Sequence, residues 1–179
     1  MNENEIRTLI QSWENLAILV RYIADYPEYL NIIVTKALDD SQPENWRAAW
    51  MVDKIHDKHP ELIVPYLPLM TDFVLTTQNY SKKRHLLKLI SLHDIPEEKM
   101  GILLNFSMDI FTSASEPVAV RVHAMQILYN IAQKEPDFTG ELIELIENEI
   151  EFHGSAGIFS RGKKLLKKLY ASKKQRQNA

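Results

Sequence analysis

The sequence predicts an all-α fold made of stacked antiparallel helix pairs, an α-α superhelix. Arginines recur at Arg47, Arg84, Arg121 and Arg161, each opening an apolar helical stretch, with spacings of 37, 37 and 40 residues. Only five glycines and eight prolines occur, and no stretch alternates apolar with polar residues as a strand does. A period of this length is typical of helical repeats, in which one helix pair cannot bury its apolar face alone and stacks on the next.

A repeated pair of residues, tryptophan and proline, predicts the first helices along the chain. Trp13 and Pro27 precede Trp46 and Pro60 by 33 residues, which predicts a helix over 13–26 that either continues or follows a segment over 3–12. A helix over 28–38 comes next and opens with an acidic residue. The helix over 46–59 has Asn45 as its predicted N-cap, and Pro60 ends it because proline disfavours helical geometry in the residue before it.

The middle of the chain repeats the same pair. A helix over 61–76 contains Pro65 and Pro68, which should kink it or delay its start. Ser81 is the predicted cap of the next helix, over 81–93, which ends before Pro96. An acidic opening then predicts a helix over 97–112.

The last two pairs complete the pattern. Pro117 stands at the first position of a helix over 118–134 whose apolar residues recur at i, i+4, i+7, i+8 and i+11. A helix over 139–152 follows, and the breaker Gly154-Ser155-Ala156-Gly157 separates it from a final helix over 158–170. We therefore expect one domain over 1–172, with a frayed basic tail over 173–179.

Composition restricts the classes of function. The chain has no cysteine, which removes disulfides, thiolate zinc sites and cysteine nucleophiles and fits a cytoplasmic protein. The N-terminus is polar and no apolar run reaches the ~20 residues of a membrane span. No cofactor or metal motif is present, because His56 and His59 lack a third ligand, and no catalytic motif indicates an enzyme.

The pattern resembles the HEAT-repeat family and its armadillo-like relatives. The likeness rests on Pro65 within a first helix, on the segment Val120-Arg121-Val122-His123-Ala124 that opens a second helix, and on the aliphatic residues that follow it. The resemblance implies a right-handed solenoid of about four helix pairs with an N-terminal cap helix. The aspartate usual before the repeat arginine is met only loosely, by Asp39 and Asp40, which argues against an Asp–Arg ladder between repeats.

Charge is sorted between the two helices of each pair. The second helices, over 46–59, 81–93, 118–134 and 158–170, carry fourteen Lys and Arg and two acids. The first helices, over 28–40, 61–76, 97–112 and 138–152, carry two Lys and thirteen acids, although the net charge of the chain is only -3. The resemblance implies that second helices line the concave face, which would make that face basic.

Two interpretations of this basic face stay open. In the first, the chain is a non-enzymatic scaffold that binds an acidic protein or peptide. The residues expected to do so are Arg47, Lys54, Arg84, Lys88, Arg121 and Arg161. In the second, lysines such as Lys82, Lys83 and Lys88 form an ordinary solvated face and the arginines pair with carboxylates of the adjacent repeat.

Two further alternatives concern nucleic acid and membranes. Trp46, Trp50 and Asp53 resemble the tryptophans and aspartate that DNA alkylation-repeat glycosylases present to DNA, although packing in the core is the usual fate of such a pair. The segment from Arg161 to Arg176 carries eight basic residues and no acid. It would suit an anionic membrane or nucleic acid, or simply the polar outer face of a capping helix. The oligomeric state is left open.

Overall fold

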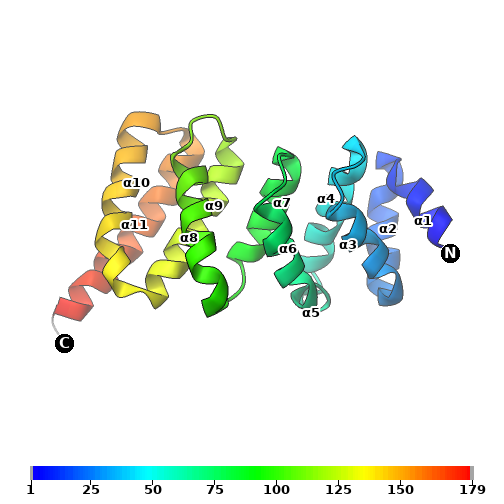
Figure 1. Ribbon diagram of the computed structural model, residues 1–179, viewed down its shortest axis with the longest axis horizontal. Coiled ribbons are helices and arrows are strands. Elements are labelled where there is room, and N and C mark those ends of the chain that lie inside the picture. The colour runs from blue at the N-terminus through cyan, green and yellow to red at the C-terminus, as the bar shows by residue number, and fades with distance from the viewer. Residues whose placement is uncertain (1, 178–179) are drawn as a thin grey trace. The chain divides into compact units, whose positions relative to one another are not determined.

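The computed structural model describes residues 2–177, and every regular element in that range is a helix. The chain divides into two compact units, Met1–Ile90 and Ser91–Ala179. The single domain expected over 1–172 stays a prediction. The predicted all-α fold of paired helices is confirmed (Figure 1).

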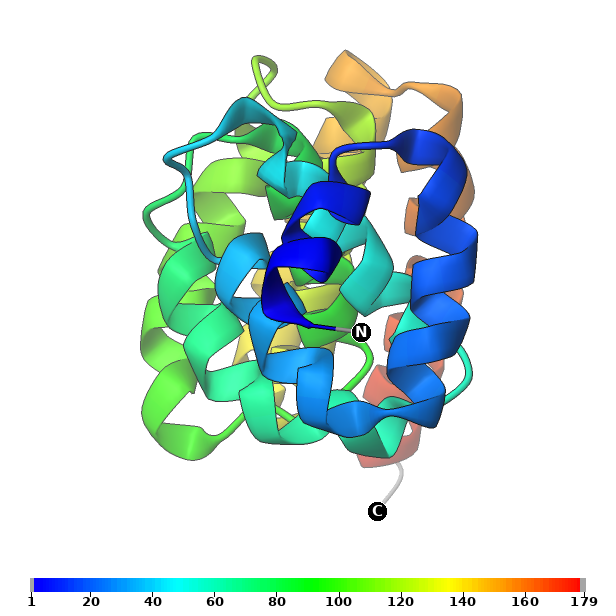
Figure 2. The same cartoon turned by 90° about the vertical axis from the view of Figure 1, so that its right-hand side faces the viewer.

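The first unit begins with α1 (Glu3–Ile10), which is separate from α2 (Leu16–Asp25) because a 3-10 turn over Trp13–Asn15 intervenes. Both lie at the N-terminal end of this unit (Figure 2). The helices that follow are α3 (Leu30–Ala37), α4 (Trp46–His56), α5 (Pro60–Ile63), α6 (Leu67–Val74) and α7 (Tyr80–Ser91). Both α2 and α3 pack on α4, and their buried aliphatic side chains form the core there.

The second unit contains two longer pairs. Its helices are α8 (Glu97–Thr112), α9 (Val118–Lys134), α10 (Thr139–His153) and α11 (Ala156–Gln177). Helix α8 packs on α9, and α11 packs on both α9 and α10. The final helix reaches Gln177, so residues 173–177 are helical where the sequence predicted fraying, and residues 178 and 179 lie outside the described part. Below, the second helices are α2, α4, α7, α9 and α11, and the first helices are α3, α6, α8 and α10.

Proline sets the turn that ends three of the second helices. The residues before Pro27, Pro60 and Pro136 have ψ angles of 73°, 64° and 83°, which are not helical. This is the geometry expected when the proline ring excludes αR in the preceding residue. Pro65 and Pro68 act as predicted, because a 3-10 turn over Val64–Tyr66 divides α5 from α6.

Asparagine rather than serine caps α7. The sequence predicted Ser81 as the cap, but the helix starts one residue earlier, at Tyr80, and Asn79 Oδ1 accepts hydrogen bonds from the backbone N–H groups of Ser81 and Lys82. Asn45 is also engaged differently, because its Nδ2 donates to Asp39 and leaves the N-terminus of α4 without a side-chain cap.

Candidate binding surfaces on the second helices

The repeat arginine of α9 is a buried structural residue. Arg121 is only 4% exposed, its Nε donates to the Phe111 carbonyl at 2.8 Å, and its Nη2 pairs with the buried carboxylate of Glu149 on α10. A guanidinium suits this place because its planar donors can satisfy a carbonyl and a carboxylate together. Arg121 therefore fits the second interpretation made from the sequence, in which the repeat arginines pair with carboxylates of the adjacent repeat. The side chain of Arg121 joins two successive helix pairs.

The other three repeat arginines differ from one another. Arg47 is half-buried and donates to the Gln11 carbonyl. Arg161 is also half-buried and donates from Nη1 to Gln126 Oε1 on α9 at 2.8 Å. Arg84 is exposed on α7. The four repeat arginines therefore have different environments although they share one sequence period. One forms a buried ion pair, two donate to neighbouring segments and one is an accessible cation.

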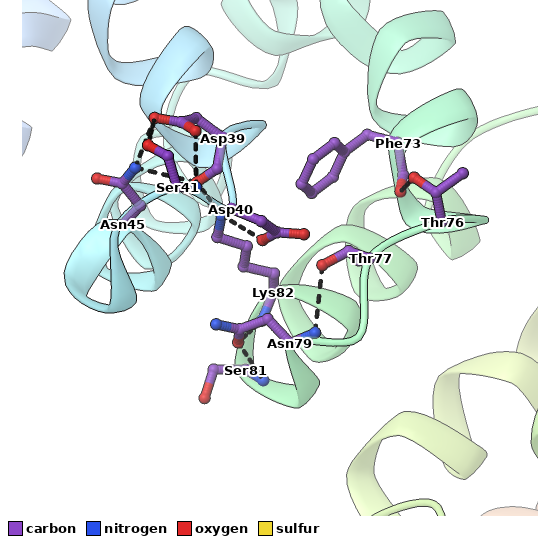
Figure 3. A network of polar contacts seen from close by, with 10 residues as sticks. All are labelled: Asp39, Asp40, Ser41, Asn45, Phe73, Thr76, Thr77, Asn79, Ser81 and Lys82. Carbon is purple, nitrogen blue, oxygen red and sulfur yellow. Dashed lines mark hydrogen bonds and ion pairs between the residues drawn. The ribbon is translucent and has the colours of Figure 1, made fainter.

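Lys82 is the most deeply buried cation in the described chain. Figure 3 shows its side chain reaching toward Asp39 and Asp40. Its side chain has 0% exposed surface, and Nζ donates to the Asp39 carbonyl at 2.5 Å and to Asp40 Oδ1 at 2.8 Å. The ammonium also lies 5.2 Å from the ring centre of Phe73 on α6. Burial alone would raise the pKa of Asp40, but hydrogen bonds, led by that from Lys82, outweigh it and lower the pKa.

The interpretation of Lys82 and Lys83 as a solvated face is therefore wrong. Both are buried, and Lys82 ties the loop after α3 to the start of α7. A buried ammonium is tolerated only where its donors are matched. The acceptors of Lys82 lie 42 and 43 residues away in the sequence, at Asp40 and Asp39. These two adjacent aspartates are the sequence feature that could have indicated a buried lysine.

Asp53 on α4 is the centre of a second buried network. Its side chain is 5% exposed, with Oδ2 2.8 Å from His85 Nδ1 and Oδ1 2.5 Å from Lys88 Nζ. Burial alone would raise the pKa of Asp53, but hydrogen bonds with His85 and Lys88 outweigh it and lower the pKa to about 2. Lys88 also contacts Asp57 at 3.0 Å, and Lys54 contacts the same carboxylate at 2.9 Å.

These contacts decide which predicted residues of the first unit are accessible. Lys88 is largely committed to Asp53 and Asp57, and Lys54 has a partner but keeps substantial exposure. Asp53 lies in the interior, held by two partners, and is not presented to solvent as a glycosylase aspartate would be. Among the predicted binding residues of this unit, Lys54 and Arg84 are the accessible cations.

All three tryptophans of the chain form one cluster. The ring centre of Trp13 lies 5.7 Å from that of Trp46 and 5.2 Å from that of Trp50, with tilted planes. Such geometry is favourable between aromatic rings and brings the N-terminal turn onto α4. Trp46 and Trp50 thus pack against Trp13, but all three lie outside the buried core, and Trp13 is 52% exposed. The expectation that the tryptophans pack in the core is therefore wrong, and Trp50 also forms part of a pocket described below.

Helix α11 carries the strongest basic surface. Its eight Lys and Arg are accompanied by no acid, and all except the half-buried Arg161 are exposed. Lys168 lies 5.5 Å from the ring centre of Tyr129 on α9, the helix that Arg161 also contacts. Because Arg161, Lys164 and Lys168 are spaced i, i+3 and i+7, they share this side of the helix. No ion pair joins an α11 lysine to a carboxylate within residues 2–177.

Acidic residues of the same unit project from its first helices. The exposed glutamates of α10 are Glu141, Glu144, Glu147 and Glu151. Tyr170 of α11 donates to Glu147 Oε1 at 2.6 Å, which marks the edge where the two surfaces meet. The charge sorting read from the sequence is thus present on exposed side chains of the second unit, with acids on α10 and bases on α11.

A pocket of about 360 Å³ lies between α2 and α4 of the first unit. Its apolar lining includes Ala17, Ala24 and Trp50, and its charged lining comes from both helices. The charged residues are Arg21, Asp25, Lys54, Asp57 and Lys58. The sequence did not predict this pocket. The small residues of α2 leave a space only because α4 packs beside them, and that packing cannot be read from α2 alone.

The described part of the chain contains neither a membrane-spanning helix nor a cluster of metal ligands. No helix there has the length and apolar character needed to span a membrane. Nor do three His, Cys, Asp or Glu side chains gather there as metal ligands would.

Comparison with known proteins identifies the repeat. Neither the curated proteins nor the solved structures contain a match to the chain. The HEAT repeat domain matches over residues 6–169, nearly the whole of the chain and both compact units. The helix pairs, the prolines between them and the buried arginine of α9 are consistent with this match. The chain belongs to the HEAT repeat domain family.

Proposed function

We propose that this HEAT repeat protein is a non-enzymatic scaffold that binds an acidic segment of another protein through exposed cations of its second helices. The observation that carries the proposal is α11, where eight basic residues and no acid occur in one helix and the exposed lysines have no carboxylate partner in the described chain. Unpaired cations on a rigid helix attract an acidic segment without first breaking an internal ion pair.

The set of binding residues is narrower than the sequence predicted. Arg121 is excluded from it because the guanidinium is buried and matched by Glu149. Arg47 and Arg161 contribute mainly to packing between helices, and Lys88 is committed to Asp53. Each unit therefore carries its own proposed surface. In the first unit it consists of Lys54 and Arg84, and in the second unit it consists of the lysines of α11, chiefly Lys163, Lys164, Lys167 and Lys168.

An acidic protein segment suits this surface better than nucleic acid does. A long polyanion would also meet the exposed glutamates of α10, and the net charge of -3 gives no general attraction to phosphate. A short acidic segment can follow one helix and avoid them. The glycosylase alternative lacks a supporting feature, since Asp53 is buried between His85 and Lys88.

The proposal is tested by titrating the full chain into a fluorescein-labelled Glu-rich peptide and, separately, into labelled duplex DNA of mixed sequence. Fluorescence anisotropy is recorded at low and at physiological salt. We expect the peptide to bind, and binding to weaken as salt rises because the contacts are largely exposed. Preferential binding of DNA, or peptide binding that is insensitive to salt, contradicts the proposal. A cytoplasmic location stays a prediction from the sequence.

A further inference from the structure

The pocket between α2 and α4 has the form of a site for a single apolar side chain. Its volume of about 360 Å³ is at the small end of the range for ligand pockets. Ala17, Val20 and Ala24 recur on one side of α2, while Trp50 and Ile55 line the pocket from α4. Alanine at two of the three α2 positions leaves the space open, and the indole of Trp50 gives it an aromatic wall.

The charges of the pocket lining favour a ligand in which acidic residues flank that apolar side chain. The pocket lining has one more positive than negative charge, from Arg21, Lys54 and Lys58 on one side of the count and Asp25 and Asp57 on the other. Asp57 is already bound by Lys54 at 2.9 Å, and Lys88 reaches the same carboxylate from α7 at 3.0 Å. Arg21 and Lys58 are exposed and have no ion pair within the described residues. They are the groups left to meet carboxylates of a ligand.

We propose that this pocket of the first unit takes an aromatic or large aliphatic anchor residue of an acidic protein segment. The flanking carboxylates of that segment contact Arg21 and Lys58, which add to Lys54 and Arg84 as binding cations of this unit. The inference rests on the proposed function and adds to it a sequence requirement in the partner: an apolar residue between acids. Burial of one such side chain against Trp50 supplies affinity that salt does not screen, and the two exposed cations select for the acidic flanks.

Intrinsic tryptophan fluorescence reports on this site specifically. The three tryptophans of the chain are Trp13, Trp46 and Trp50, all in the first unit and all in one cluster. A ligand that enters the pocket contacts Trp50 directly and changes the emission. A ligand held only by the lysines of α11 leaves the emission unchanged, because the second unit contains no tryptophan.

The test compares two Glu-rich peptides that differ at one central residue, phenylalanine in one and alanine in the other. Each is titrated into the full chain while both peptide anisotropy and tryptophan emission are followed. We expect the phenylalanine peptide to bind about tenfold more tightly, the scale of burying one large side chain. Only this peptide should shift the emission. Ala24→Leu, and separately Ala17→Leu, should remove the difference by filling the pocket.

Ile18→Leu is the matched control, since Ile18 lies on α2 beside Ala17 but is 70% exposed and outside the pocket. It should keep the tenfold difference and the emission shift. Equal binding of the two peptides without an emission change overturns the pocket assignment and leaves the proposed function standing. Failure of both peptides to bind overturns the proposed function and the pocket assignment with it. A shift in emission produced by labelled duplex DNA instead would overturn the assignment to a protein segment.

Discussion

The guanidinium of Arg121 on α9 is buried against the carboxylate of Glu149 on α10, and the same guanidinium donates to the carbonyl of Phe111 at the end of α8. One side chain therefore connects three helices of the second unit. A repeat position that the sequence marked for binding is used here to hold successive helix pairs together.

Removing one member of this pair should destabilise the second unit strongly. In Arg121→Leu, Glu149 keeps a buried charge without its cation, and the expected loss is about 3–5 kcal/mol of unfolding free energy. Urea unfolding of the full chain, followed by hydrogen exchange of peptides from α9 and α10, measures it. The double variant Arg121→Leu/Glu149→Leu should recover much of the loss. Arg84→Leu is the control, because that arginine is exposed and should change stability by only about 0.5 kcal/mol.

Replacing the buried ammonium of Lys82 should also destabilise the protein, by a smaller amount. Lys82→Met keeps the apolar stem but removes the ammonium, so the Asp39 carbonyl keeps only its donor from Asn45 and Asp40 loses its cation. The expected loss is about 1–3 kcal/mol, the scale of a hydrogen bond made by a charged group. Urea unfolding followed by tryptophan fluorescence reports on this unit. Lys58→Met, at an exposed site, should leave the midpoint unchanged, and an equal shift in both variants would contradict the assignment.

Asp53 should make the first unit sensitive to acid. Its pKa is about 2 in the folded chain against 3.8 for a free side chain, so its stabilisation is present above about pH 4 and is lost as the pH falls toward 2. A shift of this size corresponds to about 2 kcal/mol. Asp53→Asn should be less stable at neutral pH and show a shallower decline in acid, measured by tryptophan fluorescence. Asp25→Asn, at an exposed carboxylate, should retain the full decline.

Two glycines should respond to alanine in opposite directions. A Cβ at Gly101, inside α8, meets no atom within 4 Å, so Gly101→Ala should stabilise the protein by about 0.5–1 kcal/mol through helix propensity. A Cβ at Gly154 would lie 2.2 Å from the backbone oxygen of Ile150, which cannot move aside cheaply. Gly154→Ala should therefore lower the thermal midpoint. Calorimetry of the two variants measures both effects, and a rise of the thermal midpoint in both would contradict the close approach of the Ile150 oxygen at Gly154.

The sequence was informative about helices and much less so about where long side chains end. The period and the prolines were enough to predict the pairs, because both act locally on the backbone. Arg84 and Arg121 occupy the same place in that period, yet one is exposed and the other buried. The difference is made by acceptors on other helices, Glu149 and the Phe111 carbonyl, which a single helix does not reveal.

The candidate site could also be predicted only in part, because some of its features depend on residues far apart in the sequence. The basic character of α11 was visible in the sequence because it depends on composition alone. The burial of Lys82 was not, because its acceptors lie 42 and 43 residues away. The pocket beside Trp50 could not be predicted either, since it requires the small residues of α2 to face α4.

The central claim is that an acidic partner binds the basic side of the second helices, and charge reversal tests it most directly. The variant Lys164→Glu/Lys168→Glu is compared with Lys36→Glu/Lys99→Glu, which makes the same change in net charge on the two lysines of the first helices. Affinity for the labelled Glu-rich peptide is measured by anisotropy at low salt. We predict a loss of at least about tenfold in the first variant and little change in the second. Equal losses in both variants, or none in the first, would contradict the account.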